Sequence, residues 1–501
     1  MSRYLLGVDS GLTVTKAIVF DEDGTARGTG SVPSEQSTPR PGWVEKDPDG
    51  QWAGAARAIK DSLRDAEVPV AEIAAVGVTG HGDGLYALDV DCRPVRPAIT
   101  SLDARGNDVA ARLERDGVAE EALELVGEAP FGVQPAVLAA WIREHERDVY
   151  DRIAHLLFCK DWLKLRLTAR LTTDPTEASA GLTDLRTQRY APEVLALYGL
   201  PELEGALPPV VRSYEVAGEV TTEAAAETGL RAGTPVVSGL HDCDASAVGS
   251  GGVRPGLLTM IAGTFSINEV ISNDPVTDPR LLCRNWVEPG EWMNMGNSPA
   301  SATNLEWFVR RLCPAEVERA QREGTSPFGF IEDEVEGVLR DDSHPVFVPF
   351  LYGSADSPDA SATLVGLRGW HTRGHVLRAL FEGVAFNHRT HVDALRDHFP
   401  LSEGRLTGGG ARSRTWSQTF ADVLDLPVGI PAGEEAGALG AAICAGVAAG
   451  AFPSVAEGAD RTVRIERTFE PDPQRRDRLA ETYETYLQVT DAMAPVWGRL
   501  A

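Results

Sequence analysis

Long apolar runs, paired cysteines and positive charge are all scarce in this chain of 501 residues. No apolar stretch is long enough to cross a bilayer, and Asp9 interrupts the apolar run near the N-terminus, so we expect neither a signal peptide nor a membrane anchor. The six cysteines are scattered and form no Cys-x-x-Cys pair, which is typical of reduced thiols in a cytoplasm. These absences predict a soluble cytoplasmic protein.

Acidic residues outnumber basic ones by 74 to 47, and the formal net charge is -27. Such a surface disfavours nucleic acid and anionic membranes, so we expect small-molecule partners instead. A bound polyphosphate needs local help from backbone amides, a metal ion or a cation such as Lys16. A chain of this length with 43% hydrophobic residues has enough core for two or more domains.

Two common nucleotide-binding loops are also missing. The chain has no Gly-x-x-x-x-Gly-Lys-Ser/Thr loop and no Gly-x-Gly-x-x-Gly between a strand and a helix. It has instead an N-terminal hairpin, with strands expected at residues 4–9 and 13–20 around a glycine turn. The amide of Gly11 and the hydroxyl of Thr13 suit a phosphate, and Asp9 suits a hydrated magnesium ion. The alternative is an ordinary hairpin with an acidic turn.

The same design returns at residues 257–271, where the turn between two expected strands is Gly263-Thr264. Small-residue turns of this kind let backbone amides approach a phosphate. One hairpin in each half of the chain indicates a duplicated α/β architecture with nucleotide bound between the halves. We place the boundary in the small-residue region 249–256, which gives domains 1–250 and 251–501.

Asp242 lies at the centre of residues 236–266, the stretch around which we organise the chain. The apolar run 236–240 predicts a buried strand, and the small residues 245–249 predict the start of a helix. Asp242 between them would lie beside the electropositive end of that helix, which favours anionic chemistry. A single Asp proves little, so its role depends on the other motifs.

Two glycine-rich segments have the character of ligand sites. Gly80-His81-Gly82-Asp83-Gly84 follows an expected strand, and its glycines let the backbone approach a small polar ligand while His81 and Asp83 bind hydroxyl groups. Gly408-Gly409-Gly410-Ala411 ends another strand and offers a shelf without side chains for a flat base. In both cases the alternative is a glycine turn without a ligand.

Two pairs of histidines have spacings that suggest a metal site. His371 and His375 lie four residues apart, and His388 and His391 lie three apart, on or beside a helix expected at residues 373–397. No cysteine or suitably spaced acid completes a site, so we favour ordinary helix positions.

Together these landmarks resemble the FGGY family of carbohydrate kinases over nearly the whole chain. Each motif is weak alone, but they occur in the family's order, and the ordered set is specific. The matching motifs are Asp9-Ser10-Gly11-Leu12-Thr13-Val14-Thr15-Lys16, Gly42-Trp43-Val44-Glu45, Asp103-Ala104-Arg105, Gly239-Leu240-His241-Asp242, Gly263-Thr264, Arg378-Ala379-Leu380-Phe381-Glu382-Gly383 and Gly408-Gly409-Gly410-Ala411.

The resemblance implies two actin-like, ribonuclease-H-like domains with a ligand cleft between them. The first domain would hold the sugar, the first phosphate hairpin and the catalytic base Asp242. The second would hold the second hairpin and the adenine shelf. ATP and Mg²⁺ are the implied cofactors, with Lys16 among the phosphate ligands, and the family suggests a homodimer.

Segments such as Gly80-His81-Gly82-Asp83-Gly84-Leu85-Tyr86 look most like the L-xylulose kinase branch of the family. Two positions depart from the family pattern. Leu12 stands where the family usually has Thr, which removes one hydroxyl contact to phosphate. Asp83 stands where kinases for D-xylulose usually carry His, so the identity of the sugar stays open.

The predicted reaction is ATP-dependent phosphorylation of a primary hydroxyl of a five-carbon ketose such as L-xylulose, with Asp242 as general base. D-xylulose, ribulose and the polyol erythritol remain alternative substrates. A non-catalytic sensor of sugar and nucleotide on the same fold is an alternative from another class. A cysteine enzyme using Cys243 is a third alternative, but it lacks a recognisable His or Asn partner.

Overall fold

The computed structural model describes residues 3–342, 344–354, 357 and 359–500. Each of its two compact units combines a mixed β-sheet with helices, which confirms the predicted α/β class. The first unit consists of the described parts of residues 1–255, 271–294 and 435–464, and the second of those of 256–270, 295–434 and 465–501. Residues 271–294 and 435–464 thus belong to the first unit. The predicted single boundary at residue 250 assigned both segments to the second domain.

A seven-stranded sheet forms the centre of the first unit. Its strands are β1 (Tyr4–Ser10), β2 (Val14–Asp21), β3 (Ala26–Pro33), β5 (Ile73–Gly80), β11 (Val216–Glu219), β12 (Pro235–Val237) and β13 (Leu240–His241). They lie in the order β11-β12-β5-β1-β2-β3, with β13 paired to β5. β1 runs antiparallel to β2 and parallel to β5, and the register places Asp9 opposite Lys16.

Helices pack against this sheet and extend the first unit. They are α1 (Pro48–Ala66), α2 (Asn107–Arg115), α3 (Val118–Val126), α4 (Pro135–His145), α5 (Arg147–Tyr150), α6 (Cys159–Thr168), α7 (Pro175–Ala178), α8 (Pro192–Leu197), α9 (Thr222–Thr228), α10 (Asp242–Gly249), α16 (Ala436–Ala448), α17 (Val455–Thr462) and the 3₁₀ turns η1 (Val70–Glu72) and η2 (Pro201–Ala206). Short strands complete the unit: β4 (Glu45–Lys46) pairs with β7 (Ala98–Ile99), β6 (Tyr86–Leu88) with β8 (His155–Leu157), and β9 (Thr183–Asp184) with β10 (Arg189–Tyr190), while β16 is Leu282–Asn285.

Helix α1 shows how local sequence sets these elements. The carboxylate of Asp47 caps its first turn by accepting hydrogen bonds from the N–H groups of Asp49 and Gly50 at 3.3 and 3.0 Å, and proline occupies the first helical position, as helix starts favour. Its apolar face then buries Trp52 and Ile59 against the core of the first unit.

The second unit is built on another mixed sheet. Its strands are β14 (Leu257–Ala262), β15 (Ser266–Ser272), β17 (Trp292–Ser298), β20 (Glu403–Thr407), β21 (Val428–Pro431) and β22 (Ile465–Phe469), and the small pair is β18 (Val346–Val348) with β19 (Thr363–Val365). The helices are α11 (Thr303–Leu312), α12 (Pro314–Glu323), α13 (Gly329–Glu336), α14 (Arg373–Arg396), α15 (Arg414–Leu424), α18 (Pro473–Trp497) and the 3₁₀ turn η3 (Gly409–Arg412).

The two sheets repeat one topology. In the first, the order β2-β1-β5-β12-β11 begins with an antiparallel hairpin, continues through two parallel pairings and ends on an antiparallel edge strand. In the second, β15-β14-β20-β21-β22 follows the same sequence of directions. This repetition agrees with the duplicated architecture that the two glycine-turn hairpins indicated.

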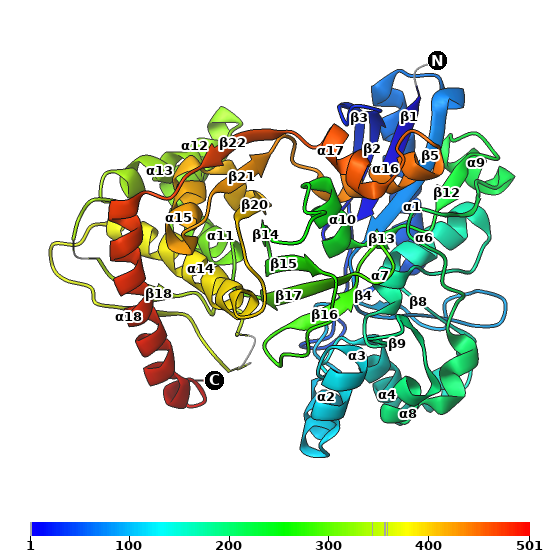
Figure 1. Ribbon diagram of the computed structural model, residues 1–501, viewed down its shortest axis with the longest axis horizontal. Helices are drawn as coiled ribbons and strands as arrows, with labels where there is room; N and C mark the ends of the chain where they lie inside the picture. The colour runs from blue at the N-terminus through cyan, green and yellow to red at the C-terminus, as the bar shows by residue number, and fades with distance from the viewer. Residues whose placement is uncertain (1–2, 343, 355–356, 358, 501) are drawn as a thin grey trace. The chain divides into compact units, whose positions relative to one another are not determined.

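Helix α16 is in direct backbone contact with the sheet of the first unit (Figure 1, where α16 lies in orange beside the blue strands). A Cβ atom on Gly7 of β1 or on Gly77 of β5 would lie 1.9 Å from a carbonyl oxygen of this helix. On another side of α16, a Cβ atom on Gly440 would lie 2.0 Å from a carbonyl oxygen of α10. Helix, sheet and α10 therefore approach one another at distances that only glycine permits.

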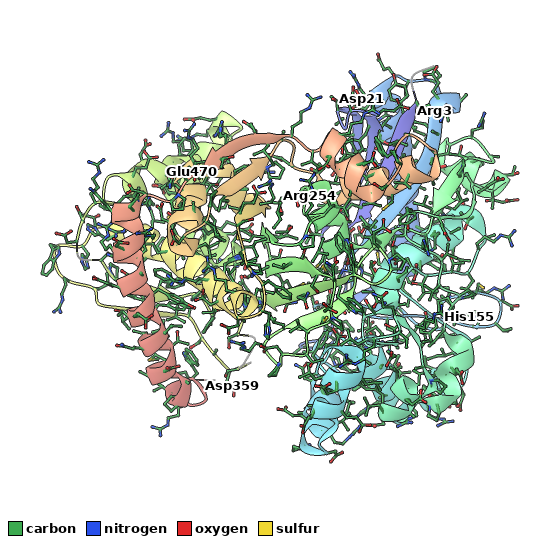
Figure 2. All side chains as sticks on the ribbon, viewed as in Figure 1. Arg3, Asp21, His155, Arg254, Asp359 and Glu470 are labelled. Carbon is green, nitrogen blue, oxygen red and sulfur yellow. The ribbon has the colours of Figure 1, made fainter. Side chains whose placement is uncertain are left out.

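Other long-range contacts fasten the returning segment to the first unit. Arg254, labelled in Figure 2, follows α10 and forms an ion pair at 2.5 Å with Asp460 of α17.

Among the described residues, no helix combines the length and apolar character needed to cross a membrane.

Glu382 of α14 forms a buried ion pair in the second unit. Arg378 Nε lies 2.8 Å from its Oε1 atom, and His344 Nε2 lies 2.8 Å from its Oε2 atom. Burial alone would raise the pKa of Glu382, but the hydrogen bond with His344 and the charges of His344 and Arg378 lower it to about 2. The ionised carboxylate is therefore part of the folded core.

Substitution of Gly77 by Ala tests the backbone contact of α16. We expect Gly77→Ala to lower the free energy of unfolding by about 1–3 kcal/mol, because backbone rather than a flexible side chain must move. Gly205→Ala is the control, since its Cβ would meet nothing within 4 Å. The measurement is urea unfolding of both variants, and equal stability of the two would contradict the contact.

The pH dependence of stability tests the Glu382 ion pair. Its folded pKa of about 2 lies below the ordinary value of 4.5, so its contribution is fully present above pH 4.5 and is lost as the pH falls towards 2. The shift corresponds to about 3 kcal/mol. We expect Glu382→Gln to cost about that much at pH 7 and clearly less at pH 3, measured by denaturant unfolding. The exposed Glu318→Gln is the control, and an equal loss for Glu382→Gln at both pH values would refute the assignment.

Candidate functional site

Asp242 is the first residue of α10 and directly follows β13. The helix thus begins at Asp242 rather than near Ala245 as the sequence predicted, so the carboxylate lies within its first turn. The side chain keeps 38% of its area exposed, and a ligand can reach it. Burial raises the pKa of this carboxyl group, while hydrogen bonds from the backbone N–H of Gly82 and from Cys243 lower it.

Asp9 lies near the end of β1, within a group of carboxylates. Burial and the negative charges of Asp242 and Glu435 raise its pKa to about 7, and the nearby Lys16 lowers it in part. The start of α16 also approaches closely, because a Cβ on Gly437 would lie 2.5 Å from the Asp9 carboxylate. Crowded carboxylate oxygens are the donors that magnesium prefers, so the residues present fit the ion predicted at Asp9.

The predicted phosphate ligands of the first hairpin have partners of their own. Lys16 Nζ lies 2.6 and 2.7 Å from the two carboxylate oxygens of Glu435. The N–H of Gly11 donates to the Val14 carbonyl at 3.0 Å, as the hairpin turn requires, and Thr13 is exposed. The structure therefore leaves Thr13 the most accessible of the three predicted ligands.

Lys46 is a cation at this hairpin that the sequence analysis missed. It is almost completely buried, and its Nζ donates to the carbonyl of Gly11 at 2.9 Å. The local sequence Glu45-Lys46 does not indicate this contact, because it joins residues that are 35 positions apart.

The two predicted sugar ligands lie at different depths. His81 is buried, its Nε2 lies 3.2 Å from the hydroxyl of Tyr86, and burial lowers its pKa to about 3, so the ring is neutral. Its Nδ1 has no hydrogen-bond partner in the part of the chain that the structure describes. Asp83 keeps 19% of its side chain exposed and adopts a left-handed backbone with φ of 53°. Asp83 is thus the more accessible of the two.

The guanidinium of Arg284 is buried and contacts Asp83. The sequence analysis did not identify this residue. Arg284 of β16 donates to Asp83 Oδ1 at 2.9 Å and to Glu128 Oε2 at 2.8 Å. Its Nη1 lies 3.3 Å from Nε2 of His241, the residue before Asp242. The only signal was a lone charge in the otherwise apolar run Leu281-Leu282-Cys283-Arg284.

In the second unit, the two predicted glycine motifs lie against each other. Gly408 has φ of 84°, and a Cβ on it would lie 2.7 Å from the carbonyl oxygen of Ala262, the residue before Gly263. A Cβ on Gly410 would lie 2.8 Å from the side chain of Ala262. A Cβ on Gly409 would meet nothing within 4 Å, so this shelf is open.

The accessible part of this second site includes both motifs. Thr264, Gly408 and Gly409 are exposed, while Ala411 is half-buried in η3. A glycine turn beside an open, side-chain-free shelf has room for a phosphate and a flat base.

The histidines of α14 take part in hydrogen bonds. His388 Nδ1 lies 2.8 Å from Asn268 Oδ1, and its Nε2 lies 3.1 Å from Ser301 Oγ. His391 Nε2 lies 3.1 Å from Ser298 Oγ. His388 is buried and His391 is half-buried, and burial lowers the pKa of His388 to about 3 and that of His391 to about 4. They belong to a polar network of the core.

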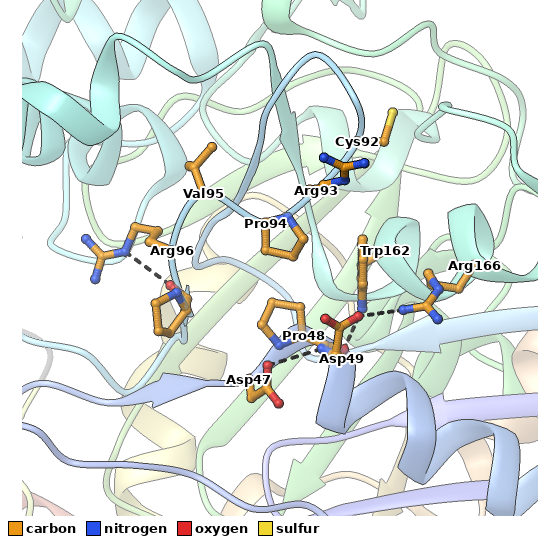
Figure 3. Close-up of a pocket in the computed structure, with 11 residues that line it drawn as sticks. Asp47, Pro48, Asp49, Cys92, Arg93, Pro94, Val95, Arg96, Trp162 and Arg166 are labelled. Atoms are coloured by element: carbon orange, nitrogen blue, oxygen red, sulfur yellow. Dashed lines mark hydrogen bonds and ion pairs between the residues drawn. The ribbon is translucent and has the colours of Figure 1, made fainter.

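A separate cavity of about 610 Å³ lies beside α1 and α6 (Figure 3). Its three arginines are already paired, since Arg166 lies 2.6 Å from Asp49, Arg96 lies 2.5 Å from Glu45 and Arg93 lies 3.5 Å from Asp91. None of the predicted site residues lines it, so it does not compete with the site at Asp242.

Comparison with known proteins identifies the family of the chain. The N-terminal domain model of the FGGY family of carbohydrate kinases matches residues 4–249, and the C-terminal domain model matches residues 258–449. The L-xylulose/3-keto-L-gulonate kinase of Escherichia coli strain K12 is 32% identical over 506 residues, covering 100% of this chain and 99% of that protein. A probable L-xylulose kinase of Haemophilus influenzae is 30% identical over 426 residues, covering 84% of this chain and 85% of that protein.

Solved structures show the same fold. The crystal structure of a xylulose kinase from Rhodospirillum rubrum superposes with a TM-score of 0.89 at 30% identity, covering 99% of this chain and 100% of that one. A second kinase structure, from Brucella ovis, gives a TM-score of 0.85 at 28% identity with full coverage of both chains. The two domain models, the full-length relatives and the repeated sheets lead to one conclusion: the chain belongs to the FGGY family of carbohydrate kinases and is an ATP-dependent sugar kinase.

Proposed function

We propose that this kinase transfers the terminal phosphoryl group of ATP to a primary hydroxyl of a five-carbon ketose such as L-xylulose, with Asp242 as the general base. The observation that carries the proposal is the position of Asp242, an accessible carboxylate in the first turn of α10, in the same unit as the exposed part of Asp83. The names of the relatives from Escherichia coli and Haemophilus influenzae, both of which include L-xylulose, support the choice of sugar.

The chemical step in this proposal uses the chain's own residues for positioning and proton transfer. As the sugar oxygen attacks the terminal phosphorus, its proton passes to the Asp242 carboxylate, the bond to the bridging oxygen breaks, and ADP leaves. A positioned base of this kind contributes about 100- to 10,000-fold in rate. His81 and Asp83 would bind sugar hydroxyls, and substrates that leave these polar groups unpaired would be rejected.

The nucleotide would be held by the two glycine-turn hairpins and the glycine shelf in this proposal. Gly11, Thr13 and Lys16 of the first hairpin and Gly263 with Thr264 of the second would surround the phosphates. The shelf formed by Gly409, Gly410 and Ala411 would hold the adenine. Residues 1–250 and 251–501 would then act as the sugar-binding and adenine-binding halves.

Magnesium would be held at Asp9, where the negative charge of Asp242 and Glu435 already accumulates. When bound, the ion would neutralise charge on the phosphates. A chain with a net charge of -27 has more carboxylates than cations, which is compatible with a divalent cation at the phosphates.

An ADP-release assay with substitution of Asp242 tests this function. With ATP and Mg²⁺, we expect L-xylulose to stimulate turnover more than D-xylulose, ribulose or erythritol. Asp242→Asn should lower kcat by about 100- to 10,000-fold because the base is lost, while the protein stays folded.

Asp148→Asn, an exposed carboxylate of α5, is the matched control and should retain full activity. If Asp242→Asn keeps turnover within a few-fold of the parent protein, Asp242 is not the base. If another sugar of the panel is used with higher kcat/KM, the choice of L-xylulose falls while the kinase activity stands.

A further inference from the structure

Arg284 is a fully buried cation. Its guanidinium group contacts three partners. Its side chain is 1% exposed. Nε donates to Glu128 Oε2 at 2.8 Å, Nη2 donates to Asp83 Oδ1 at 2.9 Å, and Nη1 lies 3.3 Å from His241 Nε2. Burying a cation is costly unless its partners are well placed, so this geometry is strongly specified by the fold.

Glu128 anchors the guanidinium from the side away from Asp83. It is itself fully buried, and its second carboxylate oxygen accepts a hydrogen bond from Gln134 Nε2 at 2.8 Å. The Gln134 carbonyl in turn accepts from the hydroxyl of Tyr198 at 3.1 Å. This chain of hydrogen bonds fixes Arg284 to the core formed by α3, α4 and α8.

On one side Arg284 fixes Asp83. That residue lies between two glycines in a left-handed conformation that non-glycine residues rarely adopt. The bond to Arg284 holds one carboxylate oxygen, while 19% of the side chain remains exposed against 1% for Arg284. Asp83 is therefore the member of the pair that a ligand meets.

On the other side Arg284 acts on His241. Nη1 of the guanidinium lies 3.3 Å from Nε2 of the His241 ring. Burial and the charge of Arg284 lower the pKa of His241 to about 4, so the ring is neutral. Nδ1 of the same ring lies 3.2 Å from Asp242 Oδ1.

The peptide N–H of Cys243 donates to the same Nδ1 atom at 3.2 Å, so the His241 ring is held at the first turn of α10, where Asp242 lies. Gly82 makes the approach possible, because a Cβ there would lie 1.8 Å from His241 Nε2.

We propose that Arg284 is the positioning residue of the sugar site: it holds Asp83 directly and acts on Asp242 through its contact with the His241 ring. The site consequently selects an uncharged ketose or polyol over a sugar acid. The selection follows from charge: Arg284 is neutralised by Asp83 and Glu128, and Lys16 by Glu435, while Lys46 is buried and donates to the carbonyl of Gly11. Asp83 and Asp242 are then the charged groups that a substrate meets, and like charges oppose a carboxylate ligand. This inference rests on the proposed function of the same site.

Kinetics of the full-length Arg284→Gln variant with ATP and Mg²⁺ test the positioning role. We expect KM for L-xylulose to rise at least about 10-fold and kcat to fall at least about 10-fold, while KM for ATP stays within a few-fold. Arg186→Gln, an exposed arginine, is the control and should change neither constant. Sugar kinetics of a folded Arg284→Gln variant that match the parent protein would overturn the proposal.

A double-mutant cycle separates positioning from mere packing. If Arg284 acts on Asp242 through His241, the loss of kcat in Arg284→Gln/His241→Phe should be no larger than in the worse single variant. Additive losses would contradict the relay. Gly82→Ala, which displaces the His241 ring, should lower kcat by a similar factor, and unchanged kcat in that variant would also contradict it.

Comparison of L-xylulose with 3-keto-L-gulonate tests the selection of uncharged substrates and needs no Arg284 variant to fold. We expect kcat/KM to favour the uncharged sugar at least about 100-fold, and Asp83→Asn to narrow that ratio at least about 10-fold. Equal use of both substrates, or an unchanged ratio in Asp83→Asn, would overturn the inference while leaving the kinase function intact. If no member of the wider sugar panel stimulates ADP release, the proposed function fails and the inference falls with it.

Discussion

The site depends on one constraint, the glycine-mediated contact of α16 with β1, β5 and α10. At Gly7, Gly77 and Gly440 the backbones are so close that a Cβ would lie within 2.0 Å of a carbonyl oxygen. These contacts fix the end of β1, the start of α10 and the start of α16 relative to one another. Asp9, Asp242 and Glu435 occupy those three positions, which explains why their charges interact.

Charge balance is the second theme of the first unit. The carboxylates near Asp9 have only Lys16 as a neighbouring cation in the interactions that set its pKa, and Lys16 is bound by Glu435. Around Asp83 the positive and negative charges are more nearly equal, because Arg284 forms ion pairs with both Asp83 and Glu128. One part of the site is thus suited to a divalent cation, and the other to uncharged hydroxyl groups.

Local patterns were enough to predict the hairpins, and the ordered set of motifs predicted the fold class through its resemblance to a known family. Apolar alternation and glycine turns gave strands at residues 4–9 and 257–261, and the structure has β1 at Tyr4–Ser10 and β14 at Leu257–Ala262. These features succeed because turn chemistry and strand periodicity act over a few residues. The shelf at Gly408–Gly410 was predicted for the same reason, since a run of glycines is visible without its surroundings.

Features made by distant parts of the chain could not be predicted in this way. Arg284 meets Glu128 across 156 positions and Asp83 across 201, and Lys16 meets Glu435 across 419. The depth of His81 below the surface also depends on tertiary packing, because the same glycine-rich segment exposes Asp83 two residues later. The return of residues 271–294 and 435–464 to the first unit follows from contacts of the same long range.

A crystal structure of the protein with L-xylulose, Mg²⁺ and a non-hydrolysable ATP analogue would test the central claim most directly. The account predicts an Asp242 carboxylate oxygen at about 3 Å from a primary hydroxyl of the sugar, with the His241 Nδ1 atom still beside that carboxylate. A sugar bound away from Asp242, or an Asp242 side chain turned from every hydroxyl of the ligand, would contradict it.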